Sequence, residues 1–215
     1  MLNSLEFNKN ELKQIKIKIF VIDYNSKKED LDKIYEKFRS KNYEFEIIKL
    51  KLDDFKGIKT LNKDNPDIEK NMKSTMASIY TSLEIAKNKC DDLTYFVEDD
   101  YIHKKESILE IISAYEKVSS ELGKELFICP ADYPFLYMDN EKTNLLIGNK
   151  RHWRTISKSL CTFMTSKEIL DKYWDNFYQN CLDRHDPFEK HLNEIYKKEV
   201  CISPVKSLSI HITNV

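Results

Sequence analysis

The sequence predicts an α/β protein with a mostly parallel central sheet. Between residues 15 and 130, apolar segments with strand-like patterns alternate with segments of helical periodicity. That alternation is typical of parallel strands joined by crossover helices. The chain has 215 residues, of which 41% are hydrophobic, enough for one sizeable core. We therefore expect one domain over residues 1–215.

The first elements form a strand, a helix and a second strand. Alternating isoleucine and lysine at 15–22 predict a strand that enters the core. Ser26 and Glu29 fit a capping box that starts a helix, and apolar residues at helical spacing continue it to Phe38. Apolar residues alternate with lysines at 48–52, which predicts the second strand.

The next elements continue the alternation. A polar, turn-rich segment at 53–66 precedes a long helix over 72–86. A short apolar strand at 93–97 follows, then a helix over 108–118 and a strand at 126–129. This order favours the parallel α/β arrangement.

After Pro130 the pattern is less regular, without a linker or an internal repeat. We expect a helix over 165–177 and a last helix that begins with Asp186 and Pro187, since proline suits the first helical position. Short strands are predicted at 145–147, 153–156, 160–164, 200–202 and 207–212.

Composition excludes several classes of function. The 35 basic and 36 acidic residues leave a net charge of −1, which argues against a nucleic-acid partner. The three glycines, Gly57, Gly123 and Gly148, exclude a Walker loop and a dinucleotide-binding fingerprint. The five cysteines are scattered, and neither a secretory signal nor a run of about 18 apolar residues is present. We therefore expect a cytoplasmic protein with reduced thiols.

Three successive carboxylates, Glu98, Asp99 and Asp100, follow the apolar strand at 93–97. Ligands of open α/β sheets bind beyond the carboxyl ends of strands. Repulsion between adjacent carboxylates is relieved by protonation or by a cation, and Mn²⁺ and Mg²⁺ favour carboxylate oxygens. The alternative is a strand that simply ends in a solvated acidic turn.

The order of elements, with the Glu98-Asp99-Asp100 motif in place, resembles a nucleotide-sugar glycosyltransferase of the GT-A type over roughly residues 15–212. The resemblance implies a GT-A-like three-layer sandwich, with a nucleotide-sugar-binding half and an acceptor half. It also implies that Asp100 contacts the metal ion directly. Glu98 or Asp99 would then reach the metal through water or contact the sugar and ribose region.

The same resemblance implies the halves 15–130 and 131–215. It places Asp23, Tyr24 and Asn25 where such enzymes hold the base and ribose of the nucleotide. The alternative is an Asx-type turn before a helix. Other residues implied to contact the base are Asn71 and Lys73, for which the alternative is a plain helix surface.

Near the C-terminus, His211 resembles the late histidine that completes the metal site in the family; the alternative is a strand histidine that faces solvent. Arg154 or Lys158 could stabilise the charge of a departing nucleoside diphosphate, and Trp153 could stack on an acceptor sugar. The segment Asp132-Tyr133-Pro134, just past a strand, could bind the donor sugar or the acceptor. An ordinary amphipathic strand explains the arginine and tryptophan equally well.

Asp186 and Glu189 are the candidates for the catalytic base, which an inverting transferase needs near the acceptor hydroxyl. In the family this base tends to lie at the start of a late helix. The pair also fits a simple helix cap, which needs no function. Of the two residues we favour Asp186.

The predicted function is the metal-dependent transfer of a sugar from a nucleoside-diphosphate sugar, expected to be a UDP-sugar, to a saccharide or lipid-linked acceptor. A lipid-linked acceptor would allow peripheral association with a membrane. One rival is a metal-dependent phosphohydrolase or nuclease, because His185-Asp186 resembles the HD pair of such enzymes. The other rival is a non-catalytic module that binds nucleotide sugars or carbohydrates.

Overall fold

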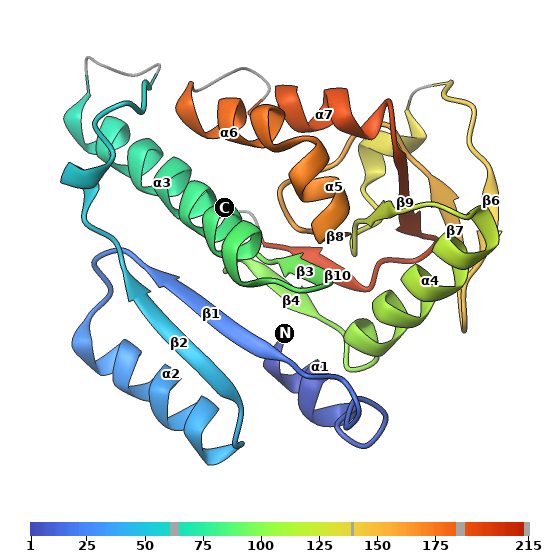
Figure 1. Cartoon of the computed structure of the whole chain (residues 1–215), viewed down its shortest axis with the longest axis horizontal. Coiled ribbons are helices and arrows are strands. Elements are labelled where there is room, and N and C mark those ends of the chain that lie inside the picture. The colour runs from blue at the N-terminus through green and yellow to red at the C-terminus, as the bar shows by residue number, and fades with distance from the viewer. Residues whose placement is uncertain (61–64, 139, 184–187, 213–215) are drawn as a thin grey trace.

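A six-stranded sheet forms the centre of the protein (Figure 1). The computed structural model describes residues 1–60, 65–138, 140–183 and 188–212. Across the sheet the strands lie in the order β3 (Leu93–Phe96), β8 (Phe163–Ser166), β5 (Leu126–Ile128), β9 (Val200–Pro204), β7 (His152–Thr155) and β6 (Leu145–Ile147).

The predicted GT-A-like sandwich with a mostly parallel central sheet is wrong. β8 lies between β3 and β5 and runs antiparallel to both. The β9–β7 and β7–β6 pairs are antiparallel too, so that among the described strands of this sheet only β5 and β9 pair in parallel. Periodicity along the chain locates strands but does not specify their neighbours, and a strand from late in the sequence fills the space that the β3-to-β5 crossover leaves.

The strand directions nevertheless bring three strand ends together. Because β8 is antiparallel to both β3 and β5, these two strands run the same way, and β9 is parallel to β5. We call the edge of the sheet where β3, β5 and β9 end the carboxyl edge. The start of β8 lies at this edge as well.

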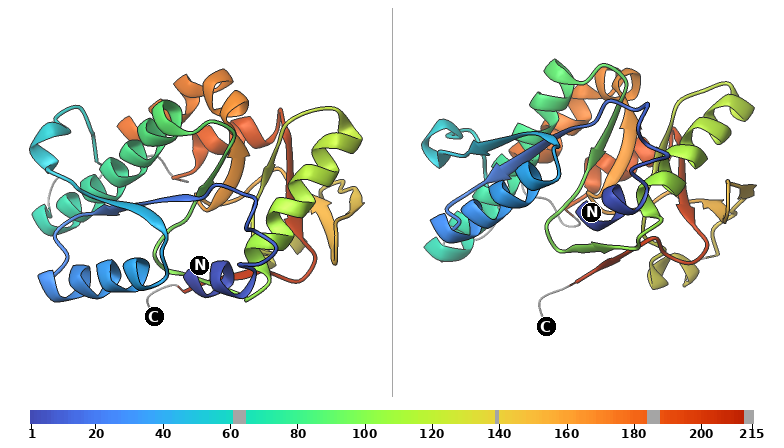
Figure 2. Two further views of the ribbon diagram at one scale, coloured as in Figure 1. Left: turned by 60° about the horizontal axis from the view of Figure 1, so that its bottom comes forward. Right: turned by 90° about the horizontal axis from the view of Figure 1, so that it is seen from below.

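Two smaller sheets accompany the central one. The parallel pair β1 (Lys18–Asp23) and β2 (Glu44–Lys49), with helix α2 (Lys28–Ser40), lies to one side in Figures 1 and 2. The antiparallel pair β4 (Tyr101–His103) and β10 (Ser209–His211) joins the chain just after β3 to the C-terminal segment. This second pair positions the candidate site.

Helices cover both faces of the central sheet. Besides α2, the described helices are α1 (Leu2–Phe7), the 3₁₀ turn η1 (Leu52–Asp54), α3 (Pro66–Lys89), α4 (Ser107–Leu122), the 3₁₀ turn η2 (Pro134–Tyr137), α5 (Lys167–Lys172), α6 (Trp174–Leu182) and α7 (Lys190–Tyr196). Along β5 and the residue after it, Leu126 and Ile128 pack in the core that α4 covers, whereas Phe127 and Cys129 pack in the core that α3, α5, α6 and α7 cover. This alternation is the period-two pattern of a strand buried on both faces.

Local sequence signals account for several helix ends. Asn65 caps α3 by accepting a hydrogen bond from the amide of Ile68 at 3.3 Å, and α4 ends at Gly123 in the left-handed conformation. The predicted capping box at the start of α2 is wrong, because no side chain caps that helix. The helix expected over 165–177 is interrupted at Tyr173, which separates α5 from α6. Neither α1 nor β4 was predicted from the sequence.

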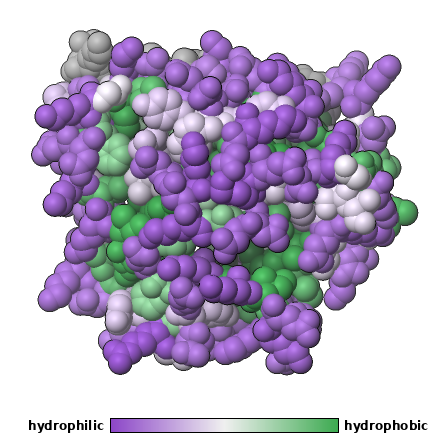
Figure 3. All heavy atoms as spheres, in the orientation of Figure 1, coloured by the Kyte–Doolittle hydropathy of each residue, from purple (hydrophilic) through white to green (hydrophobic). Residues whose placement is uncertain are grey.

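The surface is strongly polar. Hydrophilic residues cover most of the face in Figure 3, with apolar residues in smaller patches between them, as expected for a chain in which 33% of residues are charged. Within the described residues, we find no helix with the length and apolar character needed to cross a bilayer.

Gly148→Ala is expected to destabilise the fold by about 1–3 kcal/mol, the usual cost of overpacking. Gly148 begins the β6–β7 turn, and a Cβ there would lie 2.5 Å from Cδ1 of Trp153, whose ring is wholly buried. Urea denaturation measures the free energy of unfolding. Gly57→Ala is the control, since a Cβ at that position meets nothing within 4 Å. Equal stability of the two variants would contradict the expectation.

Candidate functional site

Glu98 is fixed at the carboxyl edge by the loop that precedes β8. The amide of Glu98 donates to Oγ1 of Thr162 at 3.1 Å, and the Thr162 hydroxyl donates to Oε2 of Glu98 at 3.1 Å. Thr162 is buried, at 1% exposure. This double contact exists because β8 lies beside β3, with its first residues level with the end of that strand.

Asp100 and His211, which are 111 residues apart in the sequence, meet through the β4–β10 pair. Nε2 of His211 lies 2.8 Å from Oδ2 of Asp100, and the amide of Ile212 donates to the backbone carbonyl of Asp100 at 2.7 Å. His211 is directly opposite Tyr101 in the strand register, and the two rings stack with centroids 4.8 Å apart. The imidazole is therefore held in place on both sides.

The second carboxylate oxygen of Asp100 is a candidate ligand atom for a cation. Oδ1 is buried, and no hydrogen-bond partner for it exists among the described residues. A buried oxygen of a charged group without a partner is costly and marks a place for a cation or a donor. The donor set, a carboxylate oxygen beside an imidazole, suits Mn²⁺ or Mg²⁺.

The described residues do not form a complete metal cage. No group of three or more His, Cys, Asp or Glu side chains among them is arranged to hold an ion. The predicted set of Glu98, Asp100 and His211 is thus not preformed as three ligands. Ions of this class often take only one or two carboxylates from the protein and complete their shell with water and substrate phosphates.

Burial raises the pKa of the Glu98 carboxyl to about 7. The hydrogen bond from Thr162 opposes this rise, the negative charges of Asp100 and Glu189 add to it, and His211 opposes it. The influence of Glu189 places that residue in the same electrostatic neighbourhood as Glu98. The site therefore joins residues from the end of β3, the β3–β4 turn, the start of α7 and β10.

Glu98→Gln is expected to stabilise the metal-free protein more at pH 8 than at pH 5. Because the pKa in the folded state lies above the ordinary 4.5, the folded state binds this proton more tightly, and wild-type stability falls as pH rises from about 4.5 through about 7. The difference between the two pH values should be about 2 kcal/mol. Urea denaturation of both proteins at the two pH values, with a chelator present, tests this expectation. A gain in the free energy of unfolding that does not depend on pH would contradict it.

Two tyrosines, Tyr101 and Tyr133, lie next to each other on one side of His211. The hydroxyls of Tyr101 and Tyr133 are in hydrogen-bond contact, and the Tyr133 ring stacks on Phe135 at 5.2 Å. Burial raises the pKa of both tyrosine hydroxyls above their ordinary range, which keeps them protonated. The pair connects the β4 side of the carboxyl edge to the segment that follows β5.

Asp132 and Arg154, both predicted to bind substrate, bind each other. Nη2 of Arg154 lies 2.7 Å from Oδ1 of Asp132, and the two side chains are only 8% and 10% exposed. The Tyr137 hydroxyl donates to Oδ2 of Asp132 at 2.6 Å, while the guanidinium of Arg154 lies 3.9 Å from the centre of the Tyr137 ring. The two charges of this ion pair therefore neutralise each other within the protein.

The residues after β1 form a turn. Oδ1 of Asp23 accepts from the amide of Ser26 at 3.2 Å, which is the Asx-type turn given above as the alternative. Asn25 has a φ of 62°, and the Tyr24 ring lies 6.0 Å from Nζ of Lys70 on α3. No hydrogen bond or ion pair among the described residues joins this turn to Glu98, Asp99 or Asp100, and its role in nucleotide binding stays a prediction.

Asn71 and Lys73 lie in the first half of α3, with Asn71 exposed and Lys73 half-buried. Asp99 is exposed in the β3–β4 turn. Lys158 is half-buried in the segment that leads to Thr162. Their roles also stay predictions.

The structure describes two of the last three candidate residues, Glu189 and Trp153. Asp186 lies outside the described residues, and Glu189 stands at the start of α7. The interpretation of Trp153 as a surface for an acceptor sugar is wrong, because its ring is wholly buried in the core between the sheet and α4.

Tyr101 and Thr162 were not predicted as parts of the site, whereas Tyr133 belongs to the predicted Asp132-Tyr133-Pro134 segment. Tyr101 follows the acids directly, so that proximity along the chain could have pointed to it. Nothing in the sequence points to Thr162, because its place depends on the insertion of β8 beside β3.

No known protein family matches this chain, and no curated protein matches it significantly in sequence.

Proposed function

We propose that this protein is a metal-dependent glycosyltransferase that moves a sugar from a nucleoside-diphosphate sugar, most simply a UDP-sugar, to a saccharide or lipid-linked acceptor. The observation that carries the proposal is the Asp100–His211 pair at the carboxyl edge, with a buried, unpartnered oxygen on Asp100. Donor diphosphate oxygens would supply the ligands that the described residues lack.

The residues of the site have distinct roles in this proposal. Oδ1 of Asp100 and the His211 imidazole would hold Mn²⁺ or Mg²⁺, which neutralises the diphosphate leaving group. The Glu98 carboxyl lies beside this pair and has a raised pKa. In its protonated form it can donate a hydrogen bond to a hydroxyl of the nucleotide sugar. Glu189 accepts the proton of the acceptor hydroxyl if the reaction inverts configuration.

The test is a calorimetric titration of UDP into the protein with Mn²⁺ present and with a chelator. We expect saturable binding only with Mn²⁺, and a loss of at least about tenfold in affinity in His211→Ala. His152→Ala is the matched control, because that histidine is exposed on β7. Equal binding with the chelator, or by His211→Ala, would contradict the proposal.

Two other outcomes would favour the rival functions. Binding of UDP-sugars without turnover toward any acceptor or water would indicate a binding module. Hydrolysis of bis(p-nitrophenyl) phosphate that depends on Asp100 would indicate a phosphohydrolase.

A further inference from the structure

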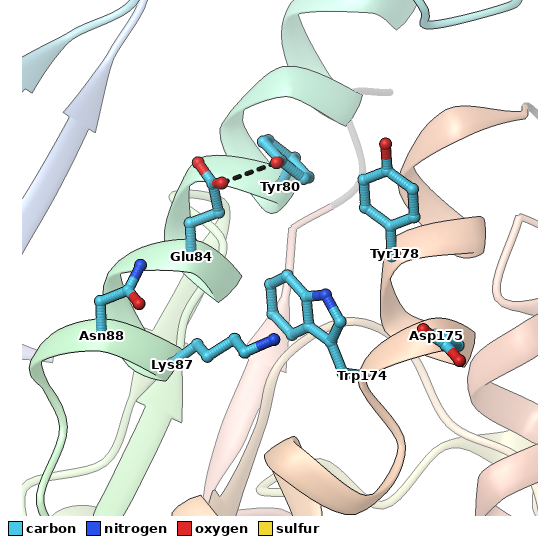
Figure 4. Close-up of a pocket in the computed structure, with 7 residues that line it drawn as sticks. All are labelled: Tyr80, Glu84, Lys87, Asn88, Trp174, Asp175 and Tyr178. Carbon is cyan, nitrogen blue, oxygen red and sulfur yellow. Dashed lines mark hydrogen bonds between the residues drawn. The ribbon is translucent and has the colours of Figure 1, made fainter.

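A pocket of about 470 Å³ lies between α3 and α6 (Figure 4). Four of its side chains come from the second half of α3 and three from the start of α6. They are Tyr80, Glu84, Lys87 and Asn88 on α3, and Trp174, Asp175 and Tyr178 on α6. None of them belongs to the site formed by Glu98, Asp99, Asp100 and His211, which we call the acidic cluster.

The pocket lies toward the end of the sheet opposite the carboxyl edge. β8 runs antiparallel to β3, and α5 follows β8 directly, so that Trp174 begins α6 beyond the far end of β8. Lys87 and Asn88 close α3, only a few residues before β3 begins. Both walls of the pocket are therefore placed by the strand ends that face away from Glu98.

Three aromatic rings gather in the pocket. The rings of Tyr80 and Tyr178 have centroids 5.6 Å apart, and Nζ of Lys87 lies 3.9 Å from the centre of the Trp174 ring. Figure 4 shows the Lys87 side chain reaching from α3 toward that ring. Trp174 is half-buried, unlike the wholly buried Trp153.

The polar groups of the pocket carry both signs of charge. Oε1 of Glu84 accepts a hydrogen bond from the Tyr80 hydroxyl at 2.6 Å, which leaves the second carboxylate oxygen of Glu84 for a ligand. Among the described residues, the side chains of Asn88 and Asp175 hold no hydrogen bond, and Lys87 forms no ion pair. The pocket thus offers both hydrogen-bond donors and hydrogen-bond acceptors next to its aromatic rings.

This mixture discriminates between classes of ligand. A phosphate or carboxylate would be repelled by Glu84 and Asp175. A quaternary ammonium group would meet Lys87, whose own ammonium already lies over the Trp174 ring. A neutral polyol has neither conflict, since each hydroxyl both donates and accepts and its C–H faces pack on aromatic rings.

We propose that the pocket between α3 and α6 binds a neutral saccharide, at a site separate from the acidic cluster. A sugar ring packs against Tyr178 and displaces the Lys87 ammonium from the Trp174 ring, and its hydroxyls bond to Asn88, Asp175 and Glu84. The inference does not rest on the proposed transferase activity, because it concerns binding alone.

The test uses the fluorescence of Trp174 as a reporter, since the other tryptophan is buried. The probes are cellotetraose, maltotetraose and tetra-N-acetylchitotetraose, each titrated to about 20 mM. We expect at least one to give a saturable change with a dissociation constant near about 1 mM. No saturable change with any of the three would overturn the proposal.

Saturation-transfer NMR then assigns the site with variants. Trp174→Ala and Asn88→Ala should each weaken binding at least about fivefold, whereas Tyr35→Ala, an exposed ring on α2, should not. Asn88 is exposed, so its variant keeps the fold even if the loss of Trp174 does not. Unchanged binding by Asn88→Ala and a folded Trp174→Ala would contradict the assignment.

Two further measurements separate this inference from the proposed function. Asp100→Ala with a chelator should bind the oligosaccharide as the wild type does, and loss of binding there would locate the ligand at the carboxyl edge and overturn the inference. Choline or inorganic phosphate in place of the saccharide should leave Trp174 fluorescence unchanged. A saturable response to either would show that the pocket takes an ion instead.

Discussion

Replacing Asp100 with alanine is expected to lower Mn²⁺-dependent turnover of a UDP-sugar by about 10²–10³-fold or more. The side chain supplies a buried carboxylate oxygen that has no partner among the described residues, and it orients His211 at 2.8 Å. Its loss removes the charge that holds the cation and frees the imidazole. The measurement is UDP release at saturating Mn²⁺, with the UDP-sugar that the wild type turns over fastest.

The melting temperature should stay within a few degrees of the wild-type value in Asp100→Ala, because the strand pairing in β4–β10 uses the backbone. Asp91→Ala is the control: that carboxylate is exposed just before the other end of β3. Turnover by a folded Asp100→Ala close to that of Asp91→Ala would contradict the role assigned to Asp100.

Short-range sequence patterns were sufficient to locate part of this site. The apolar run of β3 followed directly by acids predicted that Glu98 and Asp100 stand just past the end of a strand, which the structure confirms, although β3 is half-buried and not buried as its sequence suggested. The position of His211 beside Asp100 was predicted from a family resemblance, and the contact is present at 2.8 Å. What these residues bind is a separate question, which only the experiments above address.

Long-range pairing lies beyond such patterns. The sequence of β8 is compatible with any neighbouring strand. Its pairing with β3 and β5 made the sheet mostly antiparallel and brought Thr162 to Glu98. Trp153 illustrates the same gap, because an aromatic residue in a basic segment reads equally well as a ligand platform or as core. Burial, which depends on the whole fold, decided for the core.

Arg154→Met is expected to lower the free energy of unfolding by about 3–5 kcal/mol, because it leaves the carboxylate of Asp132 buried without its cation. That carboxylate would keep the Tyr137 hydroxyl and the amide of Lys206, at 2.6 and 3.4 Å, which do not neutralise it. Urea denaturation at pH 7 measures the loss. Lys33→Met, which breaks the exposed pair with Asp30, should cost less than about 1 kcal/mol.

The double variant Arg154→Met with Asp132→Asn separates the structural role of this pair from a role in substrate binding. Removing both charges should recover part of the lost stability, because no buried charge is left uncompensated. If Arg154 instead stabilised a departing diphosphate, Arg154→Met would leave stability within about 1 kcal/mol and weaken UDP binding with Mn²⁺. The 8% exposure of the Arg154 side chain and its 2.7 Å contact favour the structural role, since a guanidinium already paired with a buried carboxylate has to break that pair to reach a substrate.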